Sequence, residues 1–459
     1  MKRFLSLSVV ACSVGVSFAQ NAPEDVKRLR AQGPQGLQTL MAQHQAAIAA
    51  HRANPQKPDA QWPRIERMLD EVAAQRDAWA SGLYWYTDLE AAKRAAAEQK
   101  KPILSLRMLG KLSDEYSCAN SRFFRTALYA NKSVSQALRE NFILHWKSER
   151  PVPIVTIDMG DGRVVKRTLT GNSAHYLLDA TSRPLDALPG LYGPGAFARW
   201  LEGSRKLVAD WNAQTPDTRE AWLKSYHRAR ISTLAADYRG SFSIRADATT
   251  RDRLERDLLE TPTSRVTAPT AEAAGARAMA KKMGEFPLLN VSALYNAPAT
   301  REAHEEWEWS QTMRPADAQL DENSLVLMRT KTAQPIVATA PVAQSQTSES
   351  DSLLRASFSL FAPKSGPASW GPNARESTEP RDVVSSFQKA LALDSARNEY
   401  RMHAPIHAWF AKGEAGADLE KLNARVYDEL FLTPRSDPWL GLAPTGLYTA
   451  LPGDGLQTK

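Results

Sequence analysis

The residue with the clearest chemical potential in this sequence is Cys118, which stands between an apolar run and a helical pattern. The run from Ile103 to Leu109 has the length and residue types of a buried strand. A cysteine at the start of a helix can be held as a thiolate, because the helix dipole and free N–H groups can lower its pKa from about 8.5 to between about 3.5 and 7.5. Cys118 is therefore a candidate nucleophile for thiol–disulfide exchange.

The neighbours of Cys118 decide which exchange chemistry is open to it. Ser121 stands where a Cys-x-x-Cys redox motif has its second cysteine, so Cys118 would act as a monothiol that needs an external thiol as resolver. Ser121 can donate a hydrogen bond to the thiolate, and Lys111 and Arg122 add positive charge. His175 is a further candidate for activating the thiol. The opposing interpretation is that Cys118 is a small, buried apolar residue at a helix start.

The eight histidines are scattered and are weaker candidates. His403 and His407 are four residues apart, a spacing that can turn two imidazoles of a helix toward a metal ion. Pro405 lies between them, and no acidic or cysteine ligand stands at a fixed offset, so a packed or surface role is expected. The sequence contains no glycine-rich phosphate loop, serine elbow, zincin motif or EF-hand loop. We therefore predict no metal site and no cofactor.

The composition is that of an ordinary globular protein. The chain has 459 residues, 43% of them hydrophobic and 24% charged, which suffices for two or three domains. The formal charge of +7 is spread along the chain without a run of five or six basic residues. We therefore expect no nucleic-acid partner.

The N-terminus has the pattern of a secretory signal peptide. Lys2 and Arg3 precede an apolar stretch that ends in Ser17-Phe18-Ala19, a small-x-small cleavage site. The stretch is too short for a stable membrane span, and no other window approaches 18 apolar residues. Residues 1–19 are thus expected to be removed on export to the periplasm or the medium. A lipoprotein signal ending at Cys12 is a minor alternative, and in either case Cys118 has no intramolecular disulfide partner.

The chain beyond the signal peptide predicts an α+β protein. We expect an N-terminal helical segment (20–80), an α/β unit (81–210), a helical extension (211–260) and a Thr/Pro-rich linker (261–270). A mainly helical C-terminal region with a few strands (271–459) follows, with a mobile stretch at 333–351. The strands expected after Ile103–Leu109 are Phe142–Trp146, Ile154–Asp158, Val164–Leu169, Ala174–Leu178 and, in the C-terminal region, Ser324–Arg329.

The order helix, strand, cysteine loop, helix, strands, helix resembles the thioredoxin fold. Specifically, it is similar to the thioredoxin-like domains of secreted bacterial proteins. The similar segments are WYTDLEAA at 85–92, KPILSL at 101–106, the Cys-x-x-Ser at 118–121 and GNSA at 171–174, together spanning roughly 82–208. The resemblance implies a thioredoxin-like domain with Cys118 and Ser121 at its catalytic position. It also implies that Ser173 falls where that family has the cis-proline facing the active-site sulfur.

Two functions from different classes stay open, and so does the question whether the protein is an enzyme. In the first, the protein is a non-catalytic or weakly redox-active binding or scaffold protein of the cell envelope. In the second, it is a periplasmic monothiol that exchanges disulfides through Cys118. Ser121 and Ser173, which replace the second cysteine and the proline, favour the first. The export signal and the retained cysteine favour the second. Either way, the expected partner is another protein of the envelope.

Overall fold

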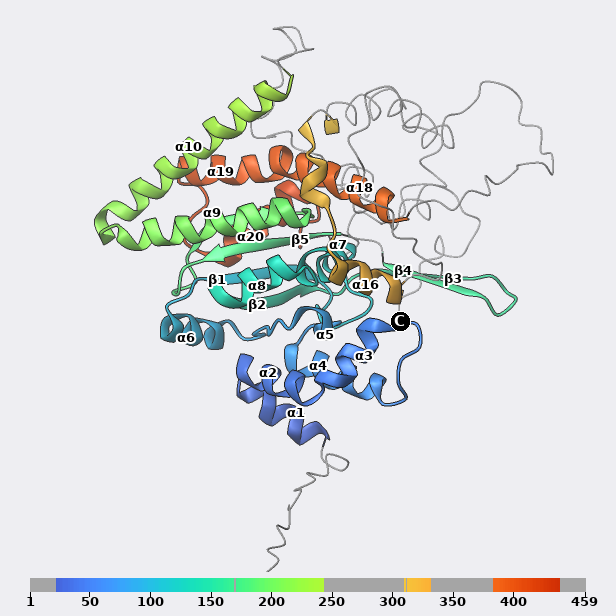
Figure 1. Cartoon of the computed structure of the whole chain (residues 1–459). Coiled ribbons are helices and arrows are strands. Elements are labelled where there is room, and N and C mark those ends of the chain that lie inside the picture. The colour runs from blue at the N-terminus through green and yellow to red at the C-terminus, as the bar shows by residue number, and fades with distance from the viewer. Residues whose placement is uncertain (1–21, 169–170, 243–308, 311, 332–382, 438–459) are drawn as a thin grey trace, which may run out of the picture.

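The computed structural model describes residues 22–168, 171–242, 309–310, 312–331 and 383–437 (Figure 1). The predicted signal peptide (1–19), linker (261–270) and mobile stretch (333–351) lie outside the described residues. Within them the chain is α+β and is built around a mixed four-stranded sheet, which confirms the predicted class.

The sheet has the strand order β2-β1-β5-β6. β1 runs parallel to β2 and antiparallel to β5, and β5 pairs antiparallel with β6. Every residue of β1, β5 and β6 is buried, as expected for apolar runs covered on both faces. Beyond β2, Tyr86 makes one more parallel bridge, to His145. The strands are β1 (Ile103–Leu109), β2 (Ile143–Arg150), β5 (Ser173–Leu178) and β6 (Pro184–Pro189).

The N-terminal helices lie beyond the β2 edge of the sheet, drawn in blue in Figure 1, and have their own apolar cluster. Gly36 permits the close approach of the first two of them, since a Cβ there would lie 1.9 Å from the carbonyl oxygen of Leu29. The helices are α1 (Ala22–Ala31), α2 (Pro34–Gln43), α3 (Gln45–Ala53), α4 (Trp62–Ala73) and α5 (Ala78–Ser81).

A second group of helices connects and flanks the strands. Asp88 is the N-cap of α6, where its carboxylate accepts the N–H of Ala91 at 2.6 Å. Between β1 and β2 the chain passes through α7, a π-helical turn and α8. The elements of this group are α6 (Leu89–Gln99), α7 (Ala119–Phe123), the π-helix η1 (Phe124–Tyr129), α8 (Lys132–Asn141) and α9 (Pro194–Ala213).

Among the C-terminal elements, η4 and α19 pack on β6 and α10 packs on α19, whereas α16 packs on η1 and α5 (Figure 1). The largest apolar cluster includes sheet residues as well as Trp409 and Tyr427, so this region and the sheet share one core. The elements are α10 (Pro216–Phe242), the 3-10 helix η3 (Pro315–Ala318), α16 (Glu322–Lys331), α18 (Val383–Asn398), the π-helix η4 (Glu399–His403), α19 (Ala404–Lys412), α20 (Leu419–Arg425) and the π-helix η5 (Val426–Leu430).

Two expectations about secondary structure need correction. The predicted strand Ser324–Arg329 is wrong, because these residues belong to helix α16. Asp321 begins that helix, and its carboxylate accepts the N–H of Ser324 at 3.0 Å. The sequence pattern does not predict strand β6, because a proline stands at each of its ends, Pro184 and Pro189. Proline is tolerated at the ends of an edge strand, where its missing N–H breaks no ladder.

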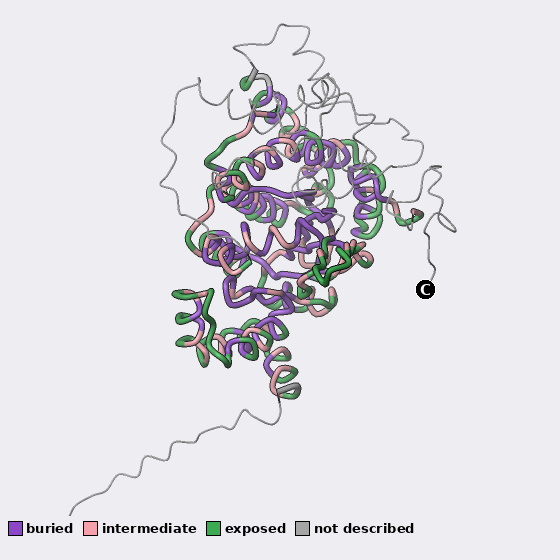
Figure 2. The backbone as a smooth tube through the Cα atoms, turned by 90° about the vertical axis from the view of Figure 1, so that its right-hand side faces the viewer, coloured by how far each residue is buried: buried purple, intermediate pink, exposed green. Residues whose placement is uncertain are grey.

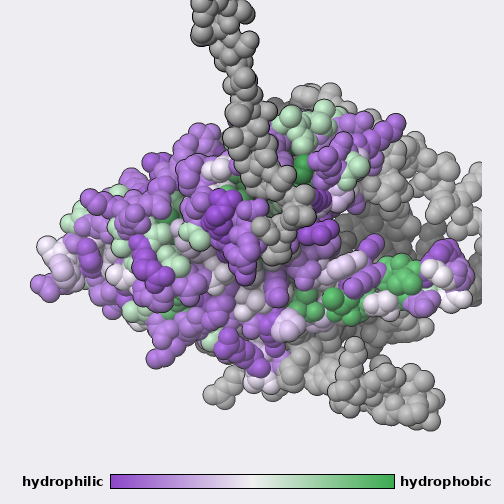
Figure 3. Space-filling model, turned by 90° about the horizontal axis from the view of Figure 1, so that it is seen from below, coloured by the Kyte–Doolittle hydropathy of each residue, from purple (hydrophilic) through white to green (hydrophobic). Residues whose placement is uncertain are grey.

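The strands predicted at 154–158 and 164–169 form a separate hairpin of β3 (Ile154–Asp158) and β4 (Val164–Thr168), which projects from the body (Figure 1). Figure 2 shows it as mostly exposed, in contrast to the buried sheet. Its large apolar side chains Ile154, Met159 and Val164 are 45%, 52% and 56% exposed. Figure 3 shows apolar residues gathered at the right of the view, where the hairpin projects from the molecule. Among the described residues, no helix has the length and apolar character to cross a membrane.

Candidate functional site

Cys118 lies directly before α7, at the end of the loop that follows β1. Its backbone N–H donates to the Leu109 carbonyl at 3.3 Å, and its sulfur lies 3.9 Å from the carbonyl oxygen of Asn172. The side chain is completely buried, and this burial raises the pKa of the thiol although Ser121 and Arg122 act in the opposite direction. The direction is opposite to the one that a helix N-terminus alone favours.

The other two predicted site residues are buried beside Cys118. Ser121 donates its hydroxyl to the backbone carbonyl of Cys118 at 2.8 Å. Ser173 begins β5 directly after Asn172, and its hydroxyl has no hydrogen-bond partner among the described residues. His175 binds the Tyr129 hydroxyl at 2.8 Å, and its burial lowers its pKa to about 3. The three predicted residues are thus brought together, but in a sealed environment.

The region around Cys118 is closed by the C-terminal part of the chain. The Tyr427 hydroxyl donates to the carbonyl of Asn172 at 3.3 Å, and the Asn172 amide donates to the Thr433 hydroxyl at 2.6 Å. The guanidinium of Arg150 fixes the same segment by donating to the carbonyls of Thr433 and Asp437. A protein substrate would have to displace this segment to reach the sulfur of Cys118.

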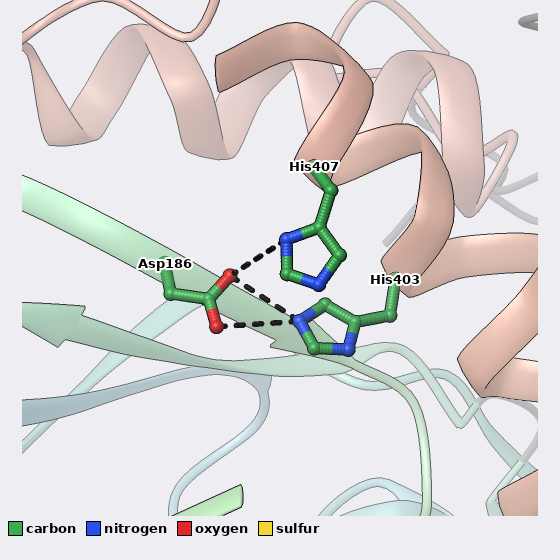
Figure 4. A group of neighbouring side chains, drawn as sticks. All are labelled: Asp186, His403 and His407. Atoms are coloured by element: carbon green, nitrogen blue, oxygen red, sulfur yellow. Dashed lines mark hydrogen bonds and ion pairs between the residues drawn. The ribbon is translucent and has the colours of Figure 1, made fainter. Parts of the chain in front are cut away.

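A second group of side chains with chemical potential lies between β6 and the C-terminal helices (Figure 4). Asp186 comes from the middle of β6, His403 ends η4, and His407 lies one turn later in α19. The His403 Nε2 atom is 3.2 and 3.3 Å from the two carboxylate oxygens of Asp186, and the His407 Nδ1 atom is 3.8 Å from Oδ1. All three side chains are at least 95% buried.

Further polar groups surround this cluster. The Nδ1 atom of His227, from α10, lies 2.8 Å from Nδ1 of His407. The Nε2–H of His227 donates to the Leu185 carbonyl at 2.9 Å. The Nδ1–H of His403 donates to Glu399 at 3.1 Å. The Trp200 indole N–H donates to Asp186 at 2.9 Å. Each ring and the carboxylate are thus held in one orientation.

The electrostatics of the cluster are dominated by burial and by opposite charges. Desolvation lowers the pKa of His403, but the carboxylates of Glu399 and Asp186 outweigh it and raise the pKa to about 10. Burial raises the pKa of Asp186, but His403 outweighs this effect and holds it below its usual range. Burial lowers the pKa of His227 to about 4 and that of His407 well below its ordinary value. His403 and Arg230, which lies 4.0 Å from Glu399, supply the positive charges that face the two carboxylates.

A cavity of about 330 Å³ adjoins the cluster. Asp186 and His403 line it, together with Arg199 and Arg230. The Arg199 guanidinium is paired with Asp317, and Arg230 lies 4.0 Å from Glu399. The cavity therefore has a charged lining, and a small molecule or ion inside it could reach Asp186 and His403 of the buried cluster.

The sequence shows only part of this cluster. His403 and His407 stand one helical turn apart, but no local pattern links Asp186 or His227 to them. Glu399 stands four residues before His403, a helical spacing that the sequence does show. Comparison with known protein families, curated proteins and solved structures finds no match to this chain.

Proposed function

We propose that the protein is an exported, thioredoxin-like binding protein of the cell envelope that does not exchange disulfides. The thioredoxin-like fold is supported by the parallel β1–β2 pair, its helical connection and the antiparallel β5–β6 hairpin. It is supported further by the position of Cys118 in the loop between β1 and the following helix.

The burial of the Cys118 sulfur is the observation that carries the proposal. Thiol–disulfide exchange requires an accessible thiolate. Here the sulfur is fully buried, its pKa is raised, and residues of the chain's own C-terminal segment lie over it. Ser121 also provides no second thiol. A monothiol exchange protein therefore remains the less supported alternative.

The β3–β4 hairpin is the surface that we propose for the protein partner. A two-stranded hairpin with few contacts to a core is only marginally stable in water, and this one contacts the body through Thr168, which binds Arg122, and through Lys166, which lies over the Tyr116 ring. This hairpin nevertheless exposes Ile154, Met159 and Val164, which cost free energy while they face water. A protein that covers these side chains removes that cost and stabilises the hairpin.

Site-specific photocrosslinking in living cells tests the partner proposal. A photoreactive residue at Met159 is compared with one at Gln136, an exposed polar position on α8. We expect one adduct of defined mass at position 159, absent at 136 and lost when Ile154 and Val164 are both changed to serine. No adduct at 159, or the same adducts at both positions, contradicts a partner at the hairpin.

Cell fractionation tests the proposed export. The full chain is expected in the periplasm or the medium without its first 19 residues, whereas a chain lacking 2–19 is expected in the cytoplasm. Retention of residues 1–19 on a cytoplasmic protein contradicts the location.

A further inference from the structure

We propose that Asp186, His403 and His407 bind one divalent transition-metal ion, Zn²⁺ in the first instance. Each of the first three residues offers one ligand atom, and these atoms all lie within 4.8 Å of one another. Figure 4 shows the two imidazoles and the carboxylate facing a common centre.

The distances between the ligand atoms suit a tetrahedral ion. Zinc–nitrogen and zinc–oxygen bonds of about 2.0–2.2 Å place two tetrahedral ligands about 3.4 Å apart. The His403 and His407 nitrogens lie 3.2 and 3.8 Å from Oδ1 of Asp186. These two distances lie on either side of the tetrahedral spacing, so a small rotation of the His407 ring brings both nitrogens and the carboxylate oxygen to one ion.

The outer contacts are those that orient metal ligands. A histidine ligand normally donates its other ring N–H to a carboxylate or a backbone carbonyl, which leaves its lone pair directed at the metal. His403 does so to Glu399. Asp186 is held by the N–H groups of Trp200 and Ala187. Nδ1 of His403 therefore keeps its proton for Glu399 when Nε2 binds the ion.

The donor types select the ion. Imidazole nitrogen suits Zn²⁺ and its transition-metal neighbours, whereas Mg²⁺ and Ca²⁺ prefer sites built from oxygen ligands. No cysteine belongs to the cluster, which excludes the thiolate sites that favour Cu⁺.

The cavity beside the cluster provides access. Asp186 and His403 form part of its wall, so an ion can enter from it without unfolding the surrounding helices. The same cavity leaves room for one non-protein ligand, such as water or a small anion. A coordination position that faces a cavity is typical of functional rather than purely structural zinc sites.

Metal titration of the wild-type protein is the first test. The full-length mature protein is stripped with a chelator and titrated with Zn²⁺ against a chromophoric chelator, and Co²⁺ is added separately as a spectroscopic probe. We expect one equivalent of each ion and a Co²⁺ visible spectrum of four-coordinate intensity with nitrogen and oxygen ligands. Absence of stoichiometric binding of either ion overturns the proposal, whatever the variants do.

Variants identify the ligands. Asp186→Asn, His403→Gln and His407→Gln are each expected to weaken Zn²⁺ binding by more than about 100-fold, and Glu399→Gln by about 10–100-fold with the stoichiometry unchanged. The matched control is His145→Gln, a buried histidine on β2 outside the cluster, which should bind as the wild type does. Should a ligand variant fail to fold, the Co²⁺ spectrum of Glu399→Gln still reports on the site. Unchanged binding in folded ligand variants, or equal loss in His145→Gln, overturns the assignment.

Discussion

Arg107 is a fully buried guanidinium on the central strand β1, so carboxylate partners must balance its positive charge. Its NH1 atom lies 3.0 Å from both Glu149 and Glu420. The Glu149 side chain is 5% exposed and that of Glu420 is 50% exposed. A buried partner cannot be replaced by water, whereas an exposed one largely can. The two carboxylates therefore form a matched pair for measuring the effect of burial.

We expect Glu149→Gln to lower the free energy of unfolding by at least about 2 kcal/mol, because it removes the buried countercharge of Arg107. Glu420→Gln should cost less than about 1 kcal/mol, since solvent screens that exposed pair. Urea unfolding of both variants at neutral pH measures the difference. Equal losses in the two variants would show that burial does not decide the strength of these pairs.

His175 predicts a specific dependence of stability on pH. Burial lowers its pKa to about 3 in the folded protein, against about 6.5 in the unfolded chain. Between these values the unfolded chain binds a proton that the folded protein does not, so the free energy of unfolding rises with pH by up to about 1.4 kcal/mol per unit. This contribution is complete above pH 6.5 and is lost progressively as the pH falls toward 3.

The variant His175→Gln keeps an acceptor for the Tyr129 hydroxyl but cannot titrate. We expect it to be less stable than the wild type at pH 7.5, and this difference should shrink steadily below pH 6.5. Urea unfolding between pH 4.5 and 7.5 provides the comparison. A difference that is constant over this range means that His175 titrates normally in the folded protein.

Gly36 and Gly203 test the packing of single elements. A Cβ at Gly36 would lie 1.9 Å from the Leu29 carbonyl oxygen, so Gly36→Ala forces α1 and α2 apart. We expect Gly36→Ala to lower the free energy of unfolding by at least about 2 kcal/mol.

Gly203 lies in the middle of α9 with no atom within 4 Å of its Cβ position, so Gly203→Ala should stabilise the protein by about 0.5–1 kcal/mol. Thermal unfolding reports both, and a stable Gly36→Ala variant would contradict the close approach of the helices.

The sequence predicted elements well where the local pattern was strong. Ile103–Leu109 is an apolar run of strand length, and this predicted strand is confirmed. The prediction failed where the same sequence pattern is compatible with both a strand and a helix. Residues 324–329 are apolar enough for a strand, but the cap at Asp321 makes them a helix. β6 is bounded by prolines, and only its pairing with β5 makes it a strand.

The buried cluster could not be predicted from the chain because tertiary packing alone assembles it. The four-residue spacing of His403 and His407 is visible in the sequence. Asp186 is more than 200 residues away from them and lies on β6, a strand that the sequence pattern does not predict. His227 comes from a third segment, α10. The burial of Cys118 is likewise a property of the whole molecule, since Tyr427 and Thr433 reach the cysteine region from the far end of the chain. The local sequence around Cys118 therefore cannot show that distant residues bury it.

The most direct test of the account as a whole is the alkylation rate of Cys118 in the native protein, measured from pH 6 to 9 and compared with the rate in urea. With the sulfur sealed, we expect native alkylation at least about 100-fold slower than in the unfolded chain, the protection that an opening free energy of about 3 kcal/mol provides. A native rate that equals the unfolded one, and that follows a thiolate pKa below about 8.5, would contradict the sealed thiol and restore disulfide exchange as the function.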